Sequence, residues 1–259
     1  MRLFSHSFIQ PFTTNQHIIM ACHLTGIYDV NRSTTLEDDD YSLVKDWADA
    51  VAALKMTGII FHNNFSAATC RQYESDHIKF MEVNYDATYN PNVYRYFIYR
   101  QFLQQYVQRL SGIFITDVSD VVVLNNPFIQ REFVNNPSAV FCGDEPKCLD
   151  NYWMKDHATH LRNRIADYEA YEETFKAAPL LNCGVIGGTA LVMRKLIEQL
   201  CEIHRQYNHN NQSEYTGDMG AFNYLLRTRY NDRLIHGHPV NTVFKAYQLT
   251  RTDCWFRHK

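Results

Sequence analysis

The chain has 259 residues, 46% of them hydrophobic and 20% charged, which predicts one globular domain with its own apolar core. Its 25 lysines and arginines nearly balance its 28 aspartates and glutamates, so the net charge of −3 argues against a general polyanion binder, and we expect no nucleic-acid partner. The cysteines are scattered without a C-x-x-C pair, and no apolar run approaches the ~18 residues of a membrane span, so we expect a soluble, cytoplasmic protein with no integral membrane segment.

Short β-rich apolar runs alternate along the chain with longer stretches of helical period, which is the pattern of a mostly parallel sheet flanked by helices. The order of expected elements is a strand at 17–23, a helix through 43–54 that stops at Gly58, strands at 58–61 and 78–83, a helix at 93–110 and a strand at 112–116. There follow a strand at 139–142, a loop at 143–146, partly buried helices in 151–176, a strand and tight turn at 178–189, a helix through 192–207, a mobile loop at 208–217, a helix at 218–229 and a strand near 234–236. We therefore predict an α/β protein without internal repeats or a domain linker.

Several common catalytic and phosphate-binding motifs are absent from the sequence. There is no G-x-G-x-x-G after the first strand, no G-x-x-x-x-G-K-[ST], no G-x-S-x-G and no H-E-x-x-H. Any bound phosphate must therefore be held by something other than a glycine-rich loop.

The sharpest local feature is a pair of carboxylates, Asp117 and Asp120, directly after the buried strand GIFIT. At the carboxyl edge of a parallel sheet, such a pair offers hard oxygen ligands for Mg²⁺ or Mn²⁺. The alternative is a structural turn in which both side chains cap backbone amides. The neighbouring motifs are needed to distinguish a metal site from a structural turn.

The passage TDVSDVVVLNNPF resembles the D-x-D-type stretch of GT-A glycosyltransferases, nearest to family 8. The second carboxylate stands at i+3, with Ser119 where the usual aspartate would be, and Ser119 is left as a water or ribose contact. The resemblance implies a Rossmann-like GT-A single domain, with a nucleotide-binding half at about 17–128 and an acceptor-binding half at about 129–245. It also implies Mn²⁺ (or Mg²⁺) on Asp117 and Asp120, with Asp117 in contact with the donor.

Three further passages fit the same resemblance. NVYRYFIYRQFL is similar to the family's Y-x-R helix, which implies that Arg95 reaches the donor sugar or diphosphate, with Arg100 as a nearby rival. LNCGVIGGT resembles the N-x-G segment, so Asn182 would bind donor-sugar hydroxyls while Gly184 lets the backbone pass close by. TGDMGAFNYLL resembles the segment that places an acidic residue, here Asp218, beside the reacting sugar.

The last of these passages, LIHGHPVNTVFK, lies where the resembling enzymes carry a metal-binding histidine and a basic residue near the diphosphate. We assign the metal ligand to His238 in preference to His236, and the basic residue to Lys245. Thr25 and Asp29, in the loop after the first strand, are candidates by position for the nucleotide's base and ribose.

These residues together predict a hexosyltransferase that transfers a sugar from a nucleoside diphosphate sugar, most simply a UDP-sugar, to a glycan or other hydroxyl acceptor, as in polysaccharide biosynthesis. An inverting enzyme needs a carboxylate such as Asp144 or Glu145 to deprotonate the acceptor. A retaining enzyme, which family 8 implies, needs no such base, and Asp218 or Asn182 would support the reacting sugar.

Two alternatives remain open from the sequence. A non-catalytic sugar- or nucleotide-binding module, derived from a glycosyltransferase, would follow if the i+3 spacing no longer holds a metal. A metal-dependent phosphohydrolase of the haloacid-dehalogenase type is the less favoured alternative, because Ser119 occupies the place of that motif's second aspartate.

Overall fold

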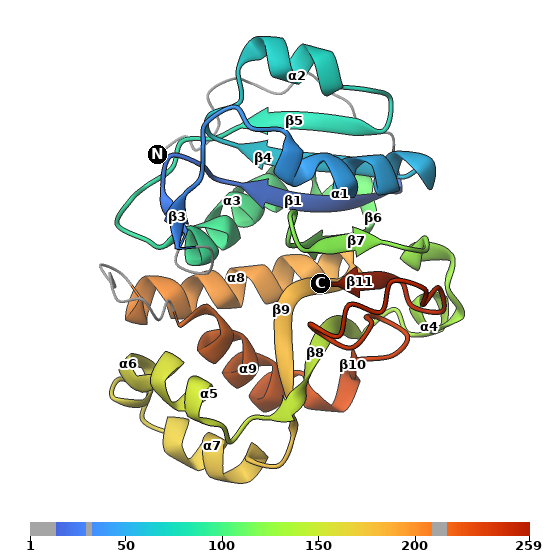
Figure 1. The fold of residues 1–259 in the computed structure, drawn as a ribbon. Helices are drawn as coiled ribbons and strands as arrows, with labels where there is room; N and C mark the ends of the chain where they lie inside the picture. The colour runs from blue at the N-terminus through green and yellow to red at the C-terminus, as the bar shows by residue number, and fades with distance from the viewer. Residues whose placement is uncertain (1–13, 30–32, 209–216) are drawn as a thin grey trace.

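The central sheet has seven strands in the order β10-β8-β9-β6-β1-β4-β5 (Figure 1). The computed structural model describes residues 14–29, 33–208 and 217–259. The strands are β1 (Gln16–His23), β4 (Thr57–His62), β5 (Ile78–Glu82), β6 (Leu110–Thr116), β8 (Val140–Cys148), β9 (Pro179–Thr189) and β10 (Leu234–His236). All neighbouring pairs are parallel except those of β9, which runs antiparallel to both β6 and β8. The predicted α/β class with a mostly parallel sheet is confirmed.

Helices cover both faces of this sheet (Figure 1). They are α1 (Ser42–Ala53), α2 (Ala67–Tyr73), α3 (Pro91–Tyr106), α4 (Arg131–Asn135), α5 (Tyr152–His157), α6 (Thr159–Arg162), α7 (Tyr168–Phe175), α8 (Ala190–Tyr207) and α9 (Asp218–Arg229). Single 3₁₀ turns occur at Val107–Arg109, Pro127–Ile129 and Asn231–Arg233. Two small antiparallel pairs complete the described structure, β2 (Tyr28–Asp29) with β3 (Thr34–Thr35) and β7 (Val121–Val123) with β11 (Phe256–His258).

The apolar core is divided by the sheet into two layers because successive strand residues point to opposite faces. In β1, Ile18 and Met20 pack into the layer formed with α3, α8 and α9, whereas Ile19 and Ala21 pack into the layer that contains α1. Each fully buried aliphatic or aromatic side chain contributes roughly 1.5–3 kcal/mol. The sheet is thereby fixed between two helical layers.

Helix α3 carries the predicted donor-binding arginine and begins with a strong N-terminal signal. The Asn90 side chain accepts a hydrogen bond from the Asn92 backbone N–H, and Pro91 occupies the first turn, where its missing N–H costs nothing. The helix ends at Tyr106 and continues as a 3₁₀ turn to Arg109, close to the predicted end at 110. Its start therefore places Arg95 in the second helical turn.

Three local predictions were wrong, each because packing between elements overrode a glycine signal. Gly58 does not stop α1 but lies inside β4, where a Cβ would stand 3.0 Å from side-chain atoms of Trp47 and Val51. The expected loop at 143–146 continues β8, in irregular register with β9. The tight turn expected within 178–189 is absent, because β9 runs unbroken to Thr189, and a Cβ at Gly187 would overlap the Phe114 ring. Gly58 and Gly187 therefore provide room for neighbouring side chains rather than bends.

The C-terminal residues return to the middle of the molecule and pair with β7 (Figure 1). In this antiparallel pair His258 lies opposite Val121, the residue that follows Asp120. Trp255 and Phe256 anchor the strand because both are buried in the layer that contains α1. The pairing brings the end of the chain to the aspartates that follow β6.

The predicted loop at 208–217 falls almost wholly outside the described residues, which omit 209–216. Among the helices that the structure describes, none combines the length and the apolar character that a membrane crossing requires.

Candidate functional site

Arg95 and Asp117 form the centre of the candidate site, at the end of β6 (Figure 1). One Arg95 guanidinium nitrogen, Nη1, donates to Asp117 Oδ1, the second, Nη2, lies 3.6 Å from Asp218 Oδ2, and Nε donates to the Asn92 carbonyl at 3.0 Å. Burial by itself lowers the Arg95 pKa, but Asp117 and the other nearby groups outweigh it and hold the pKa well above its ordinary value. Arg95 is therefore a permanent buried cation that joins two carboxylates.

A group of side chains that could hold a metal ion lies where β7 and β11 meet the end of β6. Ligand atoms of Asp117, Asp120 and His258 all lie within 4.8 Å of one another, with His258 Nε2 4.0 Å from Asp120 Oδ2. His258 is buried, and its burial lowers the imidazole pKa, so the ring is neutral at pH 7 and keeps a lone pair for a metal. Two carboxylates and a neutral imidazole suit Mn²⁺, and they also accept Mg²⁺.

The space between these ligands depends on a residue of β9 that has no side chain. A Cβ on Gly184 would stand 2.5 Å from His258 Cε1 and 2.8 Å from Asp117 Oδ2. Any other residue at this position would therefore push apart the histidine and the aspartate. The Gly184 carbonyl also accepts a hydrogen bond from the Asp117 backbone N–H at 2.8 Å, which fixes the strand against the motif.

The structure places the two histidines considered from the sequence away from Asp117 and Asp120. His238 is about half exposed, and its Nε2 lies 3.1 Å from Asp253 Oδ2 in a separate group with Cys254. The Nδ1 atom of His236 lies 2.8 Å from Asp144 Oδ2. Of the three histidines, His258 is the one whose ring lies with Asp117 and Asp120. The signal in the sequence is the apolar pair Trp255 and Phe256, two residues before His258, which is typical of a short strand.

Asp218 is the first residue of α9 and is held by neighbours on several sides. Its Oδ1 lies 3.0 Å from His157 Nε2, and its Oδ2 lies 3.6 Å from Cys183 Sγ. The Trp153 indole stacks on the His157 ring with centroids 4.5 Å apart. Neither His157 nor Cys183 was predicted from the sequence, because His157 stands in no recognisable motif and Cys183 occupies the variable position of the N-x-G segment. Together with Arg95 they immobilise the Asp218 carboxylate.

Asn182 and Glu145 form a second buried pair beside Gly184. The Asn182 amide Nδ2 donates to Glu145 Oε1 at 2.8 Å, and its Oδ1 accepts from the Gly184 backbone N–H at 2.7 Å. Asp144, the neighbour of Glu145 on β8, is partly exposed and faces His236 instead. The two carboxylates proposed for the acceptor side are thus in different environments, and Glu145 is the one in contact with Asn182.

The remaining predicted residues lie at the edge of this cluster or outside it. Thr25 is buried, and its Oγ1 donates to Asp38 Oδ1 at 3.0 Å while its backbone N–H donates to Asn63 Oδ1 at 2.9 Å. Asp29 belongs to β2, but its side chain is outside the described residues. The exposed Lys245 adjoins Phe244, whose ring packs edge-on to His258 at 4.5 Å.

Arg100, the alternative to Arg95, lines a groove against α8 and does not join the cluster. Ser119 Oγ lies 3.4 Å from Asp120 Oδ1, so the residue at the departure from the family pattern adjoins a proposed ligand.

No protein-family model matches this chain, and no curated protein matches it in sequence. Among solved structures it is similar to the galactosyltransferase LgtC, crystallised with donor and acceptor sugar analogues. The TM-score is 0.52 at 15% identity, over 94% of this chain and 86% of the LgtC chain. At 15% identity this similarity shows the fold alone. This chain has the GT-A, Rossmann-like fold. The predicted fold class is therefore confirmed in its specific form.

Proposed function

We propose that this protein is a metal-dependent glycosyltransferase, close in type to family 8, which transfers a hexose from a UDP-sugar to a hydroxyl of a glycan acceptor. The observation that carries the proposal is the group of Asp117, Asp120 and His258 around the gap at Gly184, adjoining the buried cation Arg95. The likeness to LgtC, a galactosyltransferase, supports the same activity.

Asp117, Asp120 and His258 would hold Mn²⁺ or Mg²⁺. When bound, the ion would neutralise charge that develops on the departing diphosphate. Arg95 is suited to contact the donor because its guanidinium is already fixed by Asp117 and Asn92 before any ligand arrives. Such preorganised contacts are worth about 2.7–4 kcal/mol each where charge develops in a transition state. Lys245, exposed on the segment that packs against His258, would approach the diphosphate from the outside.

Asn182 and Asp218 would contact the donor sugar from β9 and from the start of α9. Glu145 keeps Asn182 oriented through the 2.8 Å hydrogen bond, and His157 does the same for Asp218. The family resemblance implies retention of configuration, which needs no acceptor base. Glu145, rather than Asp144, is the base that we would propose for an inverting reaction, because it lies in the Asn182 cluster. We propose Thr25 and Asp29 as the residues beside the nucleotide's base and ribose. Thr25 would act by fixing its loop, through its hydrogen bonds to Asp38 and Asn63.

The test compares two histidines that lie in different groups. Purified wild type, His258→Gln and His238→Gln are titrated calorimetrically with UDP in the presence of Mn²⁺, and again with EDTA. We expect binding by wild type and His238→Gln that EDTA removes, and binding weakened at least about tenfold in His258→Gln, since one metal ligand is lost. Equal binding by the two variants would overturn the His258 assignment. Metal-independent binding of UDP or free glycans by wild type would instead favour a non-catalytic module.

A turnover assay then separates an enzyme from a binding protein. Wild type is incubated with UDP-glucose or UDP-galactose and Mn²⁺, and released UDP is measured with and without a panel of oligosaccharides. Glycosylated product requires an acceptor, whereas a phosphohydrolase would release phosphate from simple phosphate esters in its absence.

A further inference from the structure

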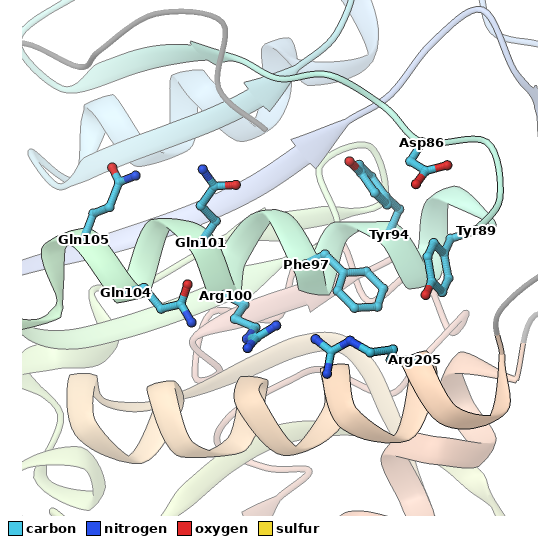
Figure 2. A pocket seen from close by; sticks show the side chains of 9 residues that line it. All are labelled: Asp86, Tyr89, Tyr94, Phe97, Arg100, Gln101, Gln104, Gln105 and Arg205. Carbon is cyan, nitrogen blue, oxygen red and sulfur yellow. The ribbon is translucent and has the colours of Figure 1, made fainter. Parts of the chain in front are cut away.

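A groove of about 510 Å³ lies along α3 where that helix packs against α8 (Figure 2). This volume falls within the roughly 300–1,000 Å³ that is typical of small-ligand sites. Figure 2 shows Arg100, Gln104 and Arg205 in the strip between the two helices, with the Phe97 ring next to Arg205. The groove shares no lining residue with the candidate active site. Arg95 and Arg100 lie about 140° apart around the axis of α3, because the helix turns about 100° per residue.

The lining of the groove combines an aromatic end with polar side chains. The Tyr89 and Phe97 rings are 4.7 Å apart and form the aromatic end. Gln104 follows Phe97 by seven residues, which corresponds to about 10 Å along the helix, so the groove is longer than a single sugar ring. Aromatic rings beside amide groups suit a carbohydrate, since sugars present apolar ring faces and hydroxyls.

Arg100 adds a positive charge to the groove, and the carboxylate of Asp86 lies at the aromatic end, beside Tyr89. Within the part of the chain that the structure describes, the Arg100 Nε is buried with no hydrogen-bond partner, and its guanidinium forms no ion pair. Arg205, by contrast, is paired with Glu202 at 2.6 Å on α8. A buried donor without an acceptor is costly, and a carboxylate is the acceptor that a guanidinium binds best.

We propose that the groove between α3 and α8 is a second carbohydrate site that binds an acidic oligosaccharide, with the Arg100 guanidinium on a sugar carboxylate, Gln104 on hydroxyls and Phe97 against a ring face. The site is independent of the donor site and would retain a charged glycan next to the catalytic domain. Its ligand is a uronic-acid oligosaccharide rather than a neutral one, because a sugar carboxylate can form an ion pair with Arg100 and an uncharged sugar cannot.

The experiment titrates the full chain with trigalacturonate and with its fully methyl-esterified form, which removes the charges and keeps the ring framework. Arg100→Gln and Phe97→Leu change the groove, and Arg194→Gln is the matched control, because Arg194 lies on α8 paired with Glu198 and outside the groove. We expect trigalacturonate to bind wild type and Arg194→Gln alike. The ester and the Arg100→Gln variant should each bind at least about tenfold more weakly, since a charge-assisted contact is lost. Phe97→Leu should weaken binding about threefold or more by loss of the aromatic face.

Several results would overturn the proposal. They are equal binding by wild type and Arg100→Gln, equal binding of the acid and the ester, and full competition by acetate at the same carboxylate concentration, which would reduce the site to an anion contact. Circular dichroism melting of each variant shows whether it is folded. UDP binding with Mn²⁺ should be unchanged in Arg100→Gln, so the groove and the proposed glycosyltransferase site can fail separately.

Discussion

Among the described residues, two groups of three side chains could hold a metal ion, and they differ in burial and in surroundings. Asp117, Asp120 and His258 lie at the end of a central strand, with His258 buried and a gap kept open by Gly184. His238, Asp253 and Cys254 lie together as well, but His238 and Asp253 are more than half exposed.

Asp253 also has a cationic partner of its own, since Arg251 Nε donates to its Oδ1 at 2.7 Å. That hydrogen bond lowers the Asp253 pKa to about 2, although the exposure of the side chain to solvent limits what the pairing contributes to stability. Asp117 is paired too, but with Arg95, a cation that is itself buried. Residue types within reach of one another are therefore not sufficient: burial, an open gap and the role of the partner distinguish the two groups.

The largest expected effect comes from Asp117, which joins the metal group to Arg95. Asp117→Asn keeps the shape but removes the charge, so we expect turnover with UDP-sugar and Mn²⁺ to fall at least ~100-fold. Asp253→Asn, the corresponding change in the exposed group, should stay within about twofold, because exposed pairs contribute little. UDP release under saturating Mn²⁺ measures both. Comparable losses in the two variants would remove the distinction between the groups.

Burial also predicts how stability responds to acid. Burial lowers the pKa of His204 from its usual 6.5 to about 3, so the folded protein keeps it neutral while the unfolded chain takes up a proton below pH 6.5. Stability contributed by neutral His204 is thus present above pH 6.5 and lost as pH falls towards 3. The loss amounts to about 2 kcal/mol between pH 7 and pH 5 for this group alone.

Urea unfolding from pH 7 to pH 5 measures this effect. The fall in the free energy of unfolding between pH 7 and pH 5 should be smaller in His204→Gln than in wild type. If the free energy of unfolding depends on pH identically in wild type and His204→Gln, groups other than His204 govern the loss of stability in acid.

A substitution at Gly184 tests the gap between His258 and Asp117 by itself, because it leaves all three proposed ligands in place. Gly184→Ala should weaken Mn²⁺-dependent UDP binding by about tenfold, since the new methyl group would displace His258 and Asp117. Gly143→Ala is the matched control on β8, where a Cβ meets its nearest atom, the Asn182 carbonyl oxygen, at 3.4 Å. Tight metal-dependent binding by Gly184→Ala would mean that the ion does not occupy this gap.

Short local patterns in the sequence were sufficient to predict the fold and most of the residues around Arg95 and Asp117. Asp117 follows an apolar strand directly, and Arg95 follows an Asn-Pro helix start by a few residues, so short stretches of sequence place both. His258 could not be placed in this way, because its position depends on the pairing of β11 with β7, more than a hundred residues away in the chain. The same holds for Gly187, whose role against Phe114 depends on strands that meet only in the folded sheet.

The smallest expected effect concerns His157, which we treat as a positioning residue because it acts through Asp218. His157→Phe keeps an aromatic ring for Trp153 to stack on but removes the hydrogen bond to Asp218 Oδ1. We expect kcat to fall about fivefold, in line with one hydrogen bond to a charged group that remains partly supported by Arg95. KM for the UDP-sugar and the affinity for Mn²⁺ should change little, since Asp117, Asp120 and His258 are untouched.

The matched control is Trp153→Phe, which retains both His157 and its hydrogen bond, and steady-state kinetics on the two variants separate kcat from KM. A change in Mn²⁺ affinity in His157→Phe would contradict the assignment, because it would mean that the Asp218 side of Arg95 and the metal side are not independent. An unchanged kcat would show that Arg95 and Cys183 hold Asp218 without help, leaving His157 as a packing residue between Trp153 and α9.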